Sequence, residues 1–551
     1  MALRLPLLTL HLPLLAPLLV FCSVASGQYY NPAIDVQSYF YSINVYDSTD
    51  KISADAMVSL RIKQPVKSFW LDLKNVDDQG KGMRVKEVSK LTAGHPEISL
   101  HFKHEKDRLI IEDPADTQRR RFYVIRYEGV PADGLIISKN KYGHRGFFGD
   151  NWPNRAHNWL PCVDDPSDKA TVGFKIMAPA HYTVVANGAL ERESPEPNGM
   201  KTTIWEESSP LSPKIMMVGI SDFAVDHPGD VEGVPVYNYL YPEDSVAGFR
   251  SYANALRILP FYIHHIGPYP FEKCGNIQSK TRFGGLENAS AICYYENSVT
   301  ASDVESLMAH EIAHQWFGDA VTETQWRHLW LSEGFATYMS HCYLESQYGP
   351  DTLVAGLRKD RIKVFEFEKK RMTPVVDSTV THDYMTLLNP NSYQKGGWVL
   401  HMLRRRIGDS LFWKAISTYY STYRNRNAST GDFEKIVESV SGQDLHTFFH
   451  QWLYTPGHPS VQLEWYYDAA NNALFITTNQ LQPVPFEFPL ELSIDGKLYT
   501  IQVTAKKNQV RLPLIAEPTT IVPDPNVNIL ATFERPAAAD KHGPALDGVR
   551  Q

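Results

Sequence analysis

The spacing of hydrophobic and polar positions divides the chain into three regions. In the first region apolar and polar residues alternate, as in 38–45, 56–62 and 121–127, and turn-forming clusters separate these runs. Alternation with a period of two is typical of half-buried β-strands. The pattern predicts a β-rich N-terminal domain, which we place at residues 28–225 and interpret as a scaffold and substrate-entry domain.

From about residue 226 the apolar spacing becomes helical. The clearest run extends from Ser245 to His265 and should form one helix that ends at Gly267 and Pro268. Further helical runs cover 398–407, 410–423, 431–440 and 444–452. These runs predict a mainly helical domain at residues 226–455.

Alternation returns after a break at residues 457–459, where the sequence is Gly-His-Pro. The runs 461–465, 473–478 and 498–503 alternate apolar and polar residues over short lengths. Short alternating strands separated by turn residues are typical of a β-sandwich. We therefore place a small C-terminal β-sandwich at residues 456–535 and expect a disordered tail at 536–551, which is rich in Ala, Asp and Gly.

Residues 1–27 have the pattern of a secretory signal peptide. A positive start that contains Arg4 precedes an apolar run from Leu5 to Phe21, and small residues at 24–27 offer a cleavage site. A membrane anchor is the alternative, but the run is only about 17 residues long and three prolines interrupt it. We therefore expect export to the periplasm or the extracellular space, with no stable membrane association.

Length, charge and cysteine content set further limits. At 551 residues the chain is too long for one core, so about three domains are expected. Its net charge of −8 argues against a nucleic-acid partner, which would need a basic face. After signal cleavage four cysteines remain: Cys162, Cys274, Cys293 and Cys342. Cys274 and Cys293 could face each other across paired strands, and the sequence leaves that disulfide open.

The clearest chemical motif is the His-Glu-x-x-His sequence at residues 310–314. On a helix, His310 and His314 project from one face, so both imidazoles can bind a single metal ion. Glu311 lies beside that face, where it can reach a water at the metal without being a ligand. We expect Glu333, separated from His314 by eighteen residues, to be the third ligand. Two histidines and one carboxylate leave the fourth tetrahedral position open, which indicates a catalytic zinc site.

The alternative is that both histidines face solvent on an ordinary amphipathic helix. Apolar and aromatic side chains surround the motif, namely Ile312, Ala313, Trp316 and Phe317. Such a background is typical of a buried segment, and polar residues in a buried segment require an explanation. The sequence therefore favours the metal site.

A second motif, Gly284-Gly285-Leu286-Glu287-Asn288, precedes the first by some twenty residues. Together with Glu333, the two motifs resemble those of the gluzincin zinc aminopeptidase family, typified by aminopeptidase N and leukotriene hydrolase. The likeness covers nearly all of the chain after its first thirty residues. It implies a multidomain α+β fold with a saddle-like N-terminal β-sheet domain, a thermolysin-like, mainly helical catalytic domain and a C-terminal β-sandwich. We expect a form that lacks the further helical domain found at the C-terminus of many members.

The resemblance also implies roles for individual residues. One Zn²⁺ per chain would be held by His310, His314 and Glu333, with Glu311 as the general base. Tyr393, sixty residues after Glu333, matches the catalytic tyrosine of the family. A phenol is a suitable neutral donor to the oxyanion that forms during attack on a carbonyl.

Substrate binding is expected at the glycine-rich motif. In the family, Glu287 would receive the free α-amine of a peptide, and the backbone of Gly284 and Gly285 would align the scissile segment. A Gln or Glu from the first domain helps to hold the amine in the relatives, and here Asp150 or Asn151 stands in its place. The remaining expected contacts are Leu286, Asn288, Phe283 and Leu329. Of these, Phe283, Leu286 and Leu329 suggest an apolar pocket.

Three positions depart from the family pattern. Leu286 stands where Met is common, and Ser332 replaces Asn before the third ligand. Ser340 occupies a place usually held by a carboxylate that supports a zinc ligand. Loss of such a supporting contact typically costs ~10–100-fold in metal affinity or activity, and Asp319 is the candidate substitute.

The sequence thus predicts an exported, monomeric zinc metallo-aminopeptidase, a hydrolase whose partners are peptides with a free N-terminus. One alternative is a zinc endopeptidase of the thermolysin type, which has no amine anchor. A second is a catalytically silent protein that keeps the fold and binds peptides. The resemblance permits a bifunctional epoxide hydrolase only weakly. Free and acetylated peptides would separate the first two functions.

Overall fold

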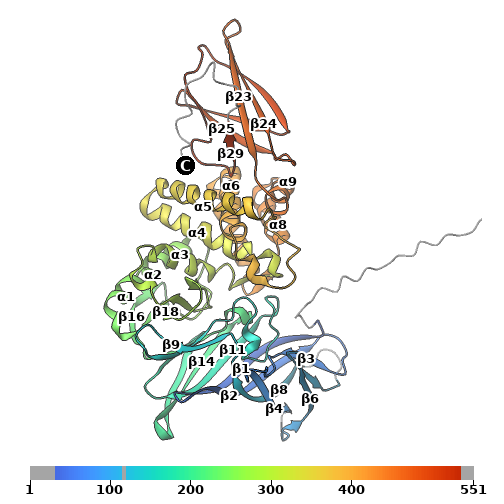
Figure 1. The fold of residues 1–551 in the computed structure, drawn as a ribbon, viewed down its shortest axis with the longest axis vertical. Helices are drawn as coiled ribbons and strands as arrows, with labels where there is room; N and C mark the ends of the chain where they lie inside the picture. The colour runs from blue at the N-terminus through green and yellow to red at the C-terminus, as the bar shows by residue number, and fades with distance from the viewer. Residues whose placement is uncertain (1–31, 93, 115–119, 535–551) are drawn as a thin grey trace, which may run out of the picture.

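The computed structural model describes residues 32–92, 94–114 and 120–534. The expected signal peptide at 1–27 and tail at 536–551 lie outside these residues. Within the described part, no helix has both the length and the apolar character needed to cross a membrane. Figure 1 shows the N-terminal strands at one end of an elongated molecule, the helices in its middle and the C-terminal strands at the other end.

Three sheets build the N-terminal region. The largest has eight strands, in the order β13 (Ala189–Glu196), β14 (Met200–Leu211), β11 (Ala170–Pro179), β1 (Ile34–Tyr46), β2 (Thr49–Ile62), β8 (Arg120–Val130), β4 (Gly82–Leu91) and β5 (Ile98–Ser99). Strand β1 pairs in parallel with β11 and antiparallel with β2. The alternation predicted for 38–45 is confirmed, because Tyr39, Tyr41 and Ile43 are buried and the residues between them are more exposed.

The two smaller N-terminal sheets complete this region. One contains β12 (Thr183–Ala186), β15 (Val218–Ser221), β10 (Arg145–Gly149) and β9 (Leu135–Lys139), and the other contains β3 (Phe69–Asp72), β7 (Arg108–Glu112) and β6 (His101–Glu105). Strand β10 leads directly into the segment that carries Asp150 and Trp152. The Trp152 ring lies 6.1 Å from the ring of Phe283 in the helical region. This segment therefore brings the N-terminal region to the site described below.

A five-stranded sheet begins the helical region, in the order β16 (Ala224–Val231), β17 (Val234–Leu240), β18 (Cys274–Ser279), β20 (Ala291–Tyr295) and β19 (Gly285–Leu286). The helices that follow or interrupt it are α1 (Ser245–Tyr252), α2 (Ala255–His265), α3 (Val304–His314), α4 (Trp330–Tyr348), α5 (Pro350–Lys370), α6 (Gly396–Ile407), α7 (Asp409–Tyr423), α8 (Thr430–Ser441) and α9 (His446–Phe449). Short parallel strands β21 (Val321–Glu323) and β22 (Arg426–Ala428) pair between them.

The prediction of a single helix from Ser245 to His265 is wrong, because α1 and α2 are separate helices. Asn254 lies at the break, and its side-chain oxygen accepts a hydrogen bond of 2.9 Å from Arg257 in the following turn. Asn has a low intrinsic helix propensity, which favours a helix end at this position. The apolar spacing continues through the break, which explains why the pattern did not reveal it.

Two further sheets form the C-terminal region. One contains β27 (Lys507–Pro513), β24 (Ala473–Gln480), β23 (Ser460–Asp468) and β29 (Thr532–Glu534), and the other contains β26 (Lys497–Val503), β25 (Phe488–Ile494) and β28 (Ile521–Pro523). The alternating runs of the sequence match β23, β24 and β26. Inward residues such as Leu474 and Leu490 are fully buried, so each sheet has an apolar face.

The four cysteines in the described residues are free and buried. Strands β18 and β20 are parallel, and Cys293 lies opposite Ile277, three residues along from Cys274. Because a strand advances about 3.3 Å per residue, this offset places the two cysteines about 10 Å apart along the strands. A disulfide needs Cα atoms within about 7 Å, so the register explains why Cys274 and Cys293 do not pair.

Candidate active site

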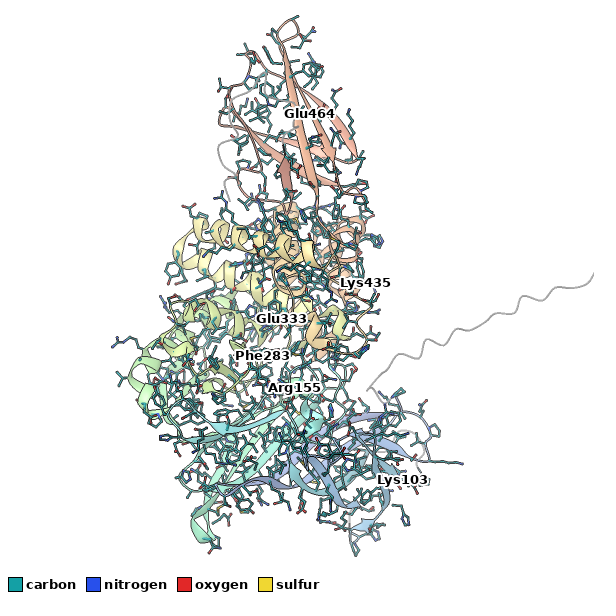
Figure 2. The ribbon with its side chains drawn as sticks, in the orientation of Figure 1. Lys103, Arg155, Phe283, Glu333, Lys435 and Glu464 are labelled. Carbon is teal, nitrogen blue, oxygen red and sulfur yellow. The ribbon has the colours of Figure 1, made fainter. Side chains whose placement is uncertain are left out.

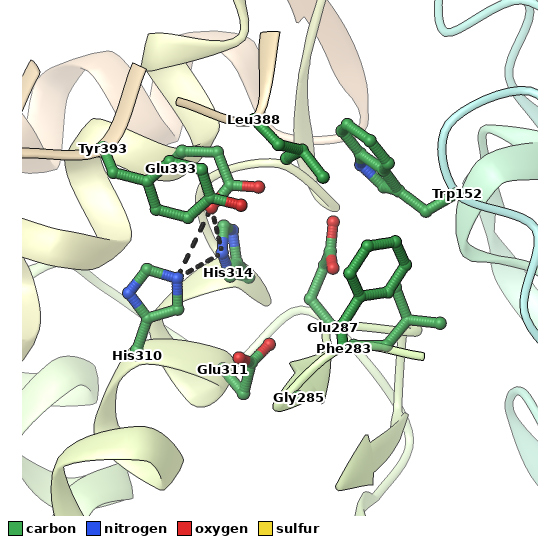
Figure 3. A pocket seen from close by; sticks show the side chains of 11 residues that line it. Trp152, Phe283, Gly285, Glu287, His310, Glu311, His314, Glu333, Leu388 and Tyr393 are labelled. Carbon is green, nitrogen blue, oxygen red and sulfur yellow. Dashed lines mark hydrogen bonds and ion pairs between the residues drawn. The ribbon is translucent and has the colours of Figure 1, made fainter. Parts of the chain in front are cut away.

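The two histidines of the His-Glu-x-x-His motif lie in the last turns of α3 and face each other. Their Nε2 atoms are 3.1 Å apart. Glu333, in the first turn of α4, places its Oε2 atom 3.4 Å from His310 Nε2 and 3.2 Å from His314 Nε2. The three ligand atoms lie within 4.8 Å of one another, and Figure 3 shows the contacts that join the three side chains. Helices α3 and α4 thus bring together residues that are far apart in the sequence.

These three side chains fit a divalent cation. Glu333 Oε2 is buried and accepts no hydrogen bond of ordinary geometry from the described residues, so a cation between it and the two imidazole nitrogens would satisfy it. Burial alone would raise the pKa of Glu333, but His314 and His310 hold that pKa well below its usual range. Two imidazole nitrogens and one carboxylate oxygen are the ligand set of catalytic zinc sites.

The far side of His314 is fixed by contacts within the protein. Its Nδ1 atom is 3.0 Å from the carbonyl oxygen of Phe317 and 3.1 Å from Ser332 Oγ. A proton on Nδ1 that is donated to the carbonyl leaves Nε2 free to bind a metal. Ser332, one of the departures from the family pattern, therefore lies directly beside a proposed ligand.

Among the described residues, neither Ser340 nor Asp319 forms a hydrogen bond to His310 or His314. Ser340 Oγ donates a hydrogen bond of 2.8 Å to the carbonyl of Thr337 in its own helix. Asp319 accepts a hydrogen bond of 2.9 Å from Gln315 Nε2. The same Gln315 nitrogen is 2.9 Å from the carbonyl oxygen of Glu287. Through Gln315, Asp319 therefore helps to hold the glycine-rich motif beside the end of α3.

Glu311 is buried at the base of the cavity, with 5% of its surface exposed. Burial raises the pKa of Glu311 well above its usual value, and the nearby Glu287 adds to that effect. A carboxylate with a raised pKa is suited to accept a proton and to return it. Its neighbour across the cavity is Gly285, where a Cβ atom would lie 2.3 Å from Glu311 Oε1. Glycine at this position therefore makes room for the carboxylate.

Glu287 lies on the opposite wall of the same cavity. The side chain is buried, and its Oε1 atom has no hydrogen-bond donor among the described residues. Burial raises the pKa of Glu287, whereas His314 and Lys214 lower it. In Figure 3 its carboxylate points into the cavity, between the metal-ligand cluster and the rings of Trp152 and Phe283. A buried carboxylate with an unpaired oxygen is suited to receive a cation from outside the protein.

Tyr393 lies in a π-helical turn, η8 (Asn391–Lys395), and its ring stacks at 6.0 Å on the ring of His310. Burial raises the pKa of Tyr393 well above its usual value, so the phenol remains a neutral donor. The cavity that these residues surround has a volume of about 70 Å³ and is lined by Trp152, Phe283, Gly285, Leu286, Glu287, His310, Glu311, His314, Glu333, Leu388 and Tyr393.

Four expected site residues do not line this cavity: Gly284, Asn288, Leu329 and Asp150. Asp150 has no free carboxylate oxygen, because one oxygen pairs with Arg155. The other accepts hydrogen bonds of 3.1 Å from Thr281 Oγ1 and from the backbone N–H of Arg282. The side chain of Asn151 is also fully used, by the carbonyls of Pro213 and Met216 and by Trp159. Neither residue offers a group to a substrate amine.

Two cavity residues, Trp152 and Leu388, were not expected from the sequence. Trp152 belongs to an aromatic, glycine-punctuated segment at 146–153, which is the signal that could have identified it. Leu388 carries no such signal. Figure 2 shows Glu333, Phe283 and Arg155 near the centre of the molecule, where the helical and N-terminal regions meet. The guanidinium of Arg155 lies 5.9 Å from the ring centre of Phe283, which confirms that proximity.

The converging histidines and carboxylates on helices α3 and α4 define a site of the gluzincin class. Residues 251–452 match the Peptidase family M1 domain, and residues 28–213 match the Peptidase M1 N-terminal domain. The chain belongs to peptidase family M1.

Similar proteins come from archaea, plants and animals. "Probable aminopeptidase 2" of Sulfurisphaera tokodaii is 27% identical over 408 residues, which are 70% of this chain and 52% of that protein. "Aminopeptidase M1" of Arabidopsis thaliana is 28% identical over 56% of this chain and 37% of its own length. "Glutamyl aminopeptidase" of Rattus norvegicus is 25% identical over 77% of this chain and 47% of its own length. The chain thus spans about half the length, or less, of these curated relatives.

Proposed function

We propose that this protein is a zinc-dependent aminopeptidase that removes the N-terminal residue from peptides with a free α-amine. The observation that carries the proposal is the buried Oε1 atom of Glu287, which has no donor among the described residues and faces the cavity beside the metal-ligand cluster. An α-ammonium group supplies the missing donor and positive charge. A peptide held at its amine would then present its first carbonyl to the ligand cluster.

The metal ligands would be His310, His314 and Glu333. When zinc is bound, it lowers the pKa of a water in the open coordination position towards about 7 and polarises the substrate carbonyl. The relatives bear aminopeptidase names, and this supports removal of N-terminal residues by the present chain.

The chain's own residues would perform the remaining steps. Glu287 accepts hydrogen bonds from the α-ammonium group and sets the position of the first residue. Glu311 accepts the proton of the attacking water and transfers it to the nitrogen of the leaving amine as the C–N bond breaks. The hydroxyl of Tyr393 donates a hydrogen bond to the oxygen on which negative charge develops.

We extend the proposal to the organisation of the chain. Residues 28–225, 226–455 and 456–535 would form an N-terminal β domain, the catalytic domain and a β-sandwich made of the two C-terminal sheets. Residues 1–27 would direct export, and the mature protein would act as a monomer. The apolar faces of the C-terminal sheets support the sandwich.

The test combines metal analysis with a panel of aminoacyl fluorophores, each offered with a free and with an acetylated amine. We expect one zinc per chain and release of the fluorophore from the free-amine substrates alone. Cleavage of acetylated peptides at an internal bond, at rates comparable with those of the free-amine substrates, would instead indicate a thermolysin-type endopeptidase. Binding of peptides without turnover, in protein that contains zinc, would indicate a catalytically silent relative.

A further inference from the structure

Lys395 lies two residues after Tyr393, and the proposed reaction does not use it. Lys395 is the last residue of the π-helical turn η8, and its side chain is fully buried. Its Nζ atom donates hydrogen bonds of 2.8 Å to Glu368 Oε1 and of 2.7 Å to the carbonyl oxygen of Gly457. Lys395 therefore ties the turn that carries Tyr393 to two distant parts of the chain.

Glu368, near the end of α5, continues this connection. Its second oxygen, Oε2, contacts Nδ1 of His458, and the His458 ring stacks on Phe365 at 4.0 Å. Burial would raise the pKa of Glu368, but the contacts with His458 and Lys395 keep it below its usual value. Glu368 is therefore ionised and paired on both sides by positively charged or donating groups.

Gly457 and His458 mark the junction with the C-terminal region, because β23 begins at Ser460. Gly457 has a φ of +85°, a left-handed conformation that other residues adopt only with strain, and this conformation helps to direct its carbonyl towards Lys395. The sequence break at 457–459 is thus in direct contact with the catalytic region. The contacts run from the C-terminal junction through Glu368 and Lys395 to the turn of Tyr393.

The other side of the turn is fixed to the metal-binding helix. A Cβ atom on Gly334 would lie 2.8 Å from the Cα atom of Gly396, so α4 and the start of α6 approach through two glycines. Gly334 directly follows the proposed ligand Glu333. The turn is thus held between α4 on one side and the Lys395 contacts on the other.

Stability alone does not account for such a buried ion pair. Burial lowers the pKa of Lys395, which records the cost of placing an ammonium group there. Well-packed apolar residues of similar volume often stabilise a fold as well as a buried ion pair or better. What the pair provides is a fixed geometry, because the partners of Nζ come from different segments of the chain.

We propose that Lys395, Glu368 and His458 are positioning residues through which the C-terminal junction sets the place of the Tyr393 hydroxyl. The inference rests on the proposed function, in which Tyr393 stabilises the developing negative charge. Since a displacement of about 1 Å in a catalytic group can cost about 10²-fold in rate, loosening the turn should lower kcat.

The variants that test this are Lys395→Met, His458→Leu and His458→Asn. Lys395→Met and His458→Leu should lower kcat by ~10–100-fold, with KM and zinc content nearly unchanged. His458→Asn keeps a side-chain N–H near Glu368 and should recover most of the activity. In a Tyr393→Phe background, Lys395→Met should cause little further loss, because both changes remove the same interaction.

A matched control is available on the same helix. Arg361, also on α5, pairs with buried Asp524 at 2.8 Å and donates to the carbonyl of Ile529 at 2.7 Å. This contact also joins α5 to the C-terminal region, but it does not reach residues 391–395. Asp524→Asn should therefore leave kcat within about twofold of the wild type. An equal loss in this variant would show that any disturbance of the junction lowers activity, and would overturn the inference.

Amide hydrogen exchange gives a second measurement that needs no turnover. Exchange in residues 391–397 should be faster in Lys395→Met and His458→Leu than in the wild type and in Asp524→Asn. If Lys395→Met does not fold, the pair Lys395→Met with Glu368→Leu removes both charges and takes its place.

The outcomes separate the two proposals. Full activity in Tyr393→Phe contradicts the role proposed for Tyr393, whereas hydrogen exchange still decides whether the junction holds the turn. A large loss in Tyr393→Phe with no loss in Lys395→Met overturns the positioning role. The positioning role is also overturned if the losses in kcat caused by Lys395→Met and by Tyr393→Phe multiply when the two changes are combined.

Discussion

Gly285 and Glu311 lie so close that a single added carbon on the glycine would occupy the space of the carboxylate. Such a Cβ atom would stand 2.3 Å from Glu311 Oε1, well inside van der Waals contact. The glycine-rich motif and helix α3 therefore depend on each other. The glycine that was assigned to substrate alignment from the sequence also determines where Glu311, the proposed general base, can stand.

Gly285→Ala should displace Glu311 and lower kcat by about 10²-fold, since the base would no longer reach the attacking water. Zinc content should be unchanged because the three atoms nearest to such a Cβ all belong to Glu311 and none to a proposed ligand. The matched control is Gly284→Ala, where the nearest atom to a Cβ, Leu307 Cδ1, is 3.9 Å away. Steady-state kinetics on an aminoacyl fluorophore compare the two variants, and equal losses would contradict the steric explanation.

Glu311→Gln should abolish most turnover while zinc remains bound. The amide has nearly the shape of the carboxylate but cannot accept the proton of the water, so a loss of at least ~10² in kcat is expected. Metal analysis and kinetics on the same preparation make the comparison. A variant that retains zinc and a near-normal rate would rule out Glu311 as the general base.

Glu287→Ala should lower kcat/KM on free-amine substrates strongly, because the α-ammonium group would lose its proposed carboxylate partner in the cavity wall. The same variant should narrow the difference between free and acetylated substrates, since neither would then be held by its amine. The ratio of the two kcat/KM values is the measurement. If that ratio stays as in the wild type, another group recognises the amine.

The convergence of the histidine pair could be predicted from sequence because it depends on local spacing. His310 and His314 share a helix face, and their convergence follows from helical geometry alone. Glu333 was expected as the third ligand alongside the histidine motif, whereas Tyr393 was assigned by resemblance, and the structure brings both beside these histidines. The strands of the N- and C-terminal regions also follow from alternation, although the break between α1 and α2 does not.

Contacts between distant segments could not be predicted. Asp150 has the right charge for an amine ligand, but one of its oxygens is taken by Thr281 and Arg282, which are more than 100 residues away in the sequence. Lys395 and Gly457 are 62 residues apart, and their contact exists only once α5, α6 and the C-terminal junction have packed. A single sequence specifies which side chains are available, whereas their partners depend on tertiary packing.

The last prediction concerns Asp72 in β3, far from the metal ligands. Burial raises the pKa of Asp72 to about 7, and its Oδ1 atom has no donor among the described residues. The carboxyl group of an unfolded chain has a pKa of about 3.9. Between these values the folded protein binds the proton more tightly, so the contribution of Asp72 to stability is full below about pH 4 and is lost as the pH rises through about 7.

Asp72→Asn should remove that part of the pH dependence, because the amide is neutral throughout. Between pH 5 and pH 8 the wild type should lose on the order of 2–3 kcal/mol more local stability than the variant. Hydrogen exchange in β3 and its partner β7, measured across this range, gives the comparison.

Asp113→Asn is the control: burial opposes ionisation of Asp113, yet hydrogen bonds from Lys90 and Tyr123 keep its pKa below the usual value. Asp113 therefore stays ionised over the whole range, and its variant should leave the slope unchanged. Equal slopes in the wild type and Asp72→Asn would mean that Asp72 is already ionised in the folded protein at pH 5.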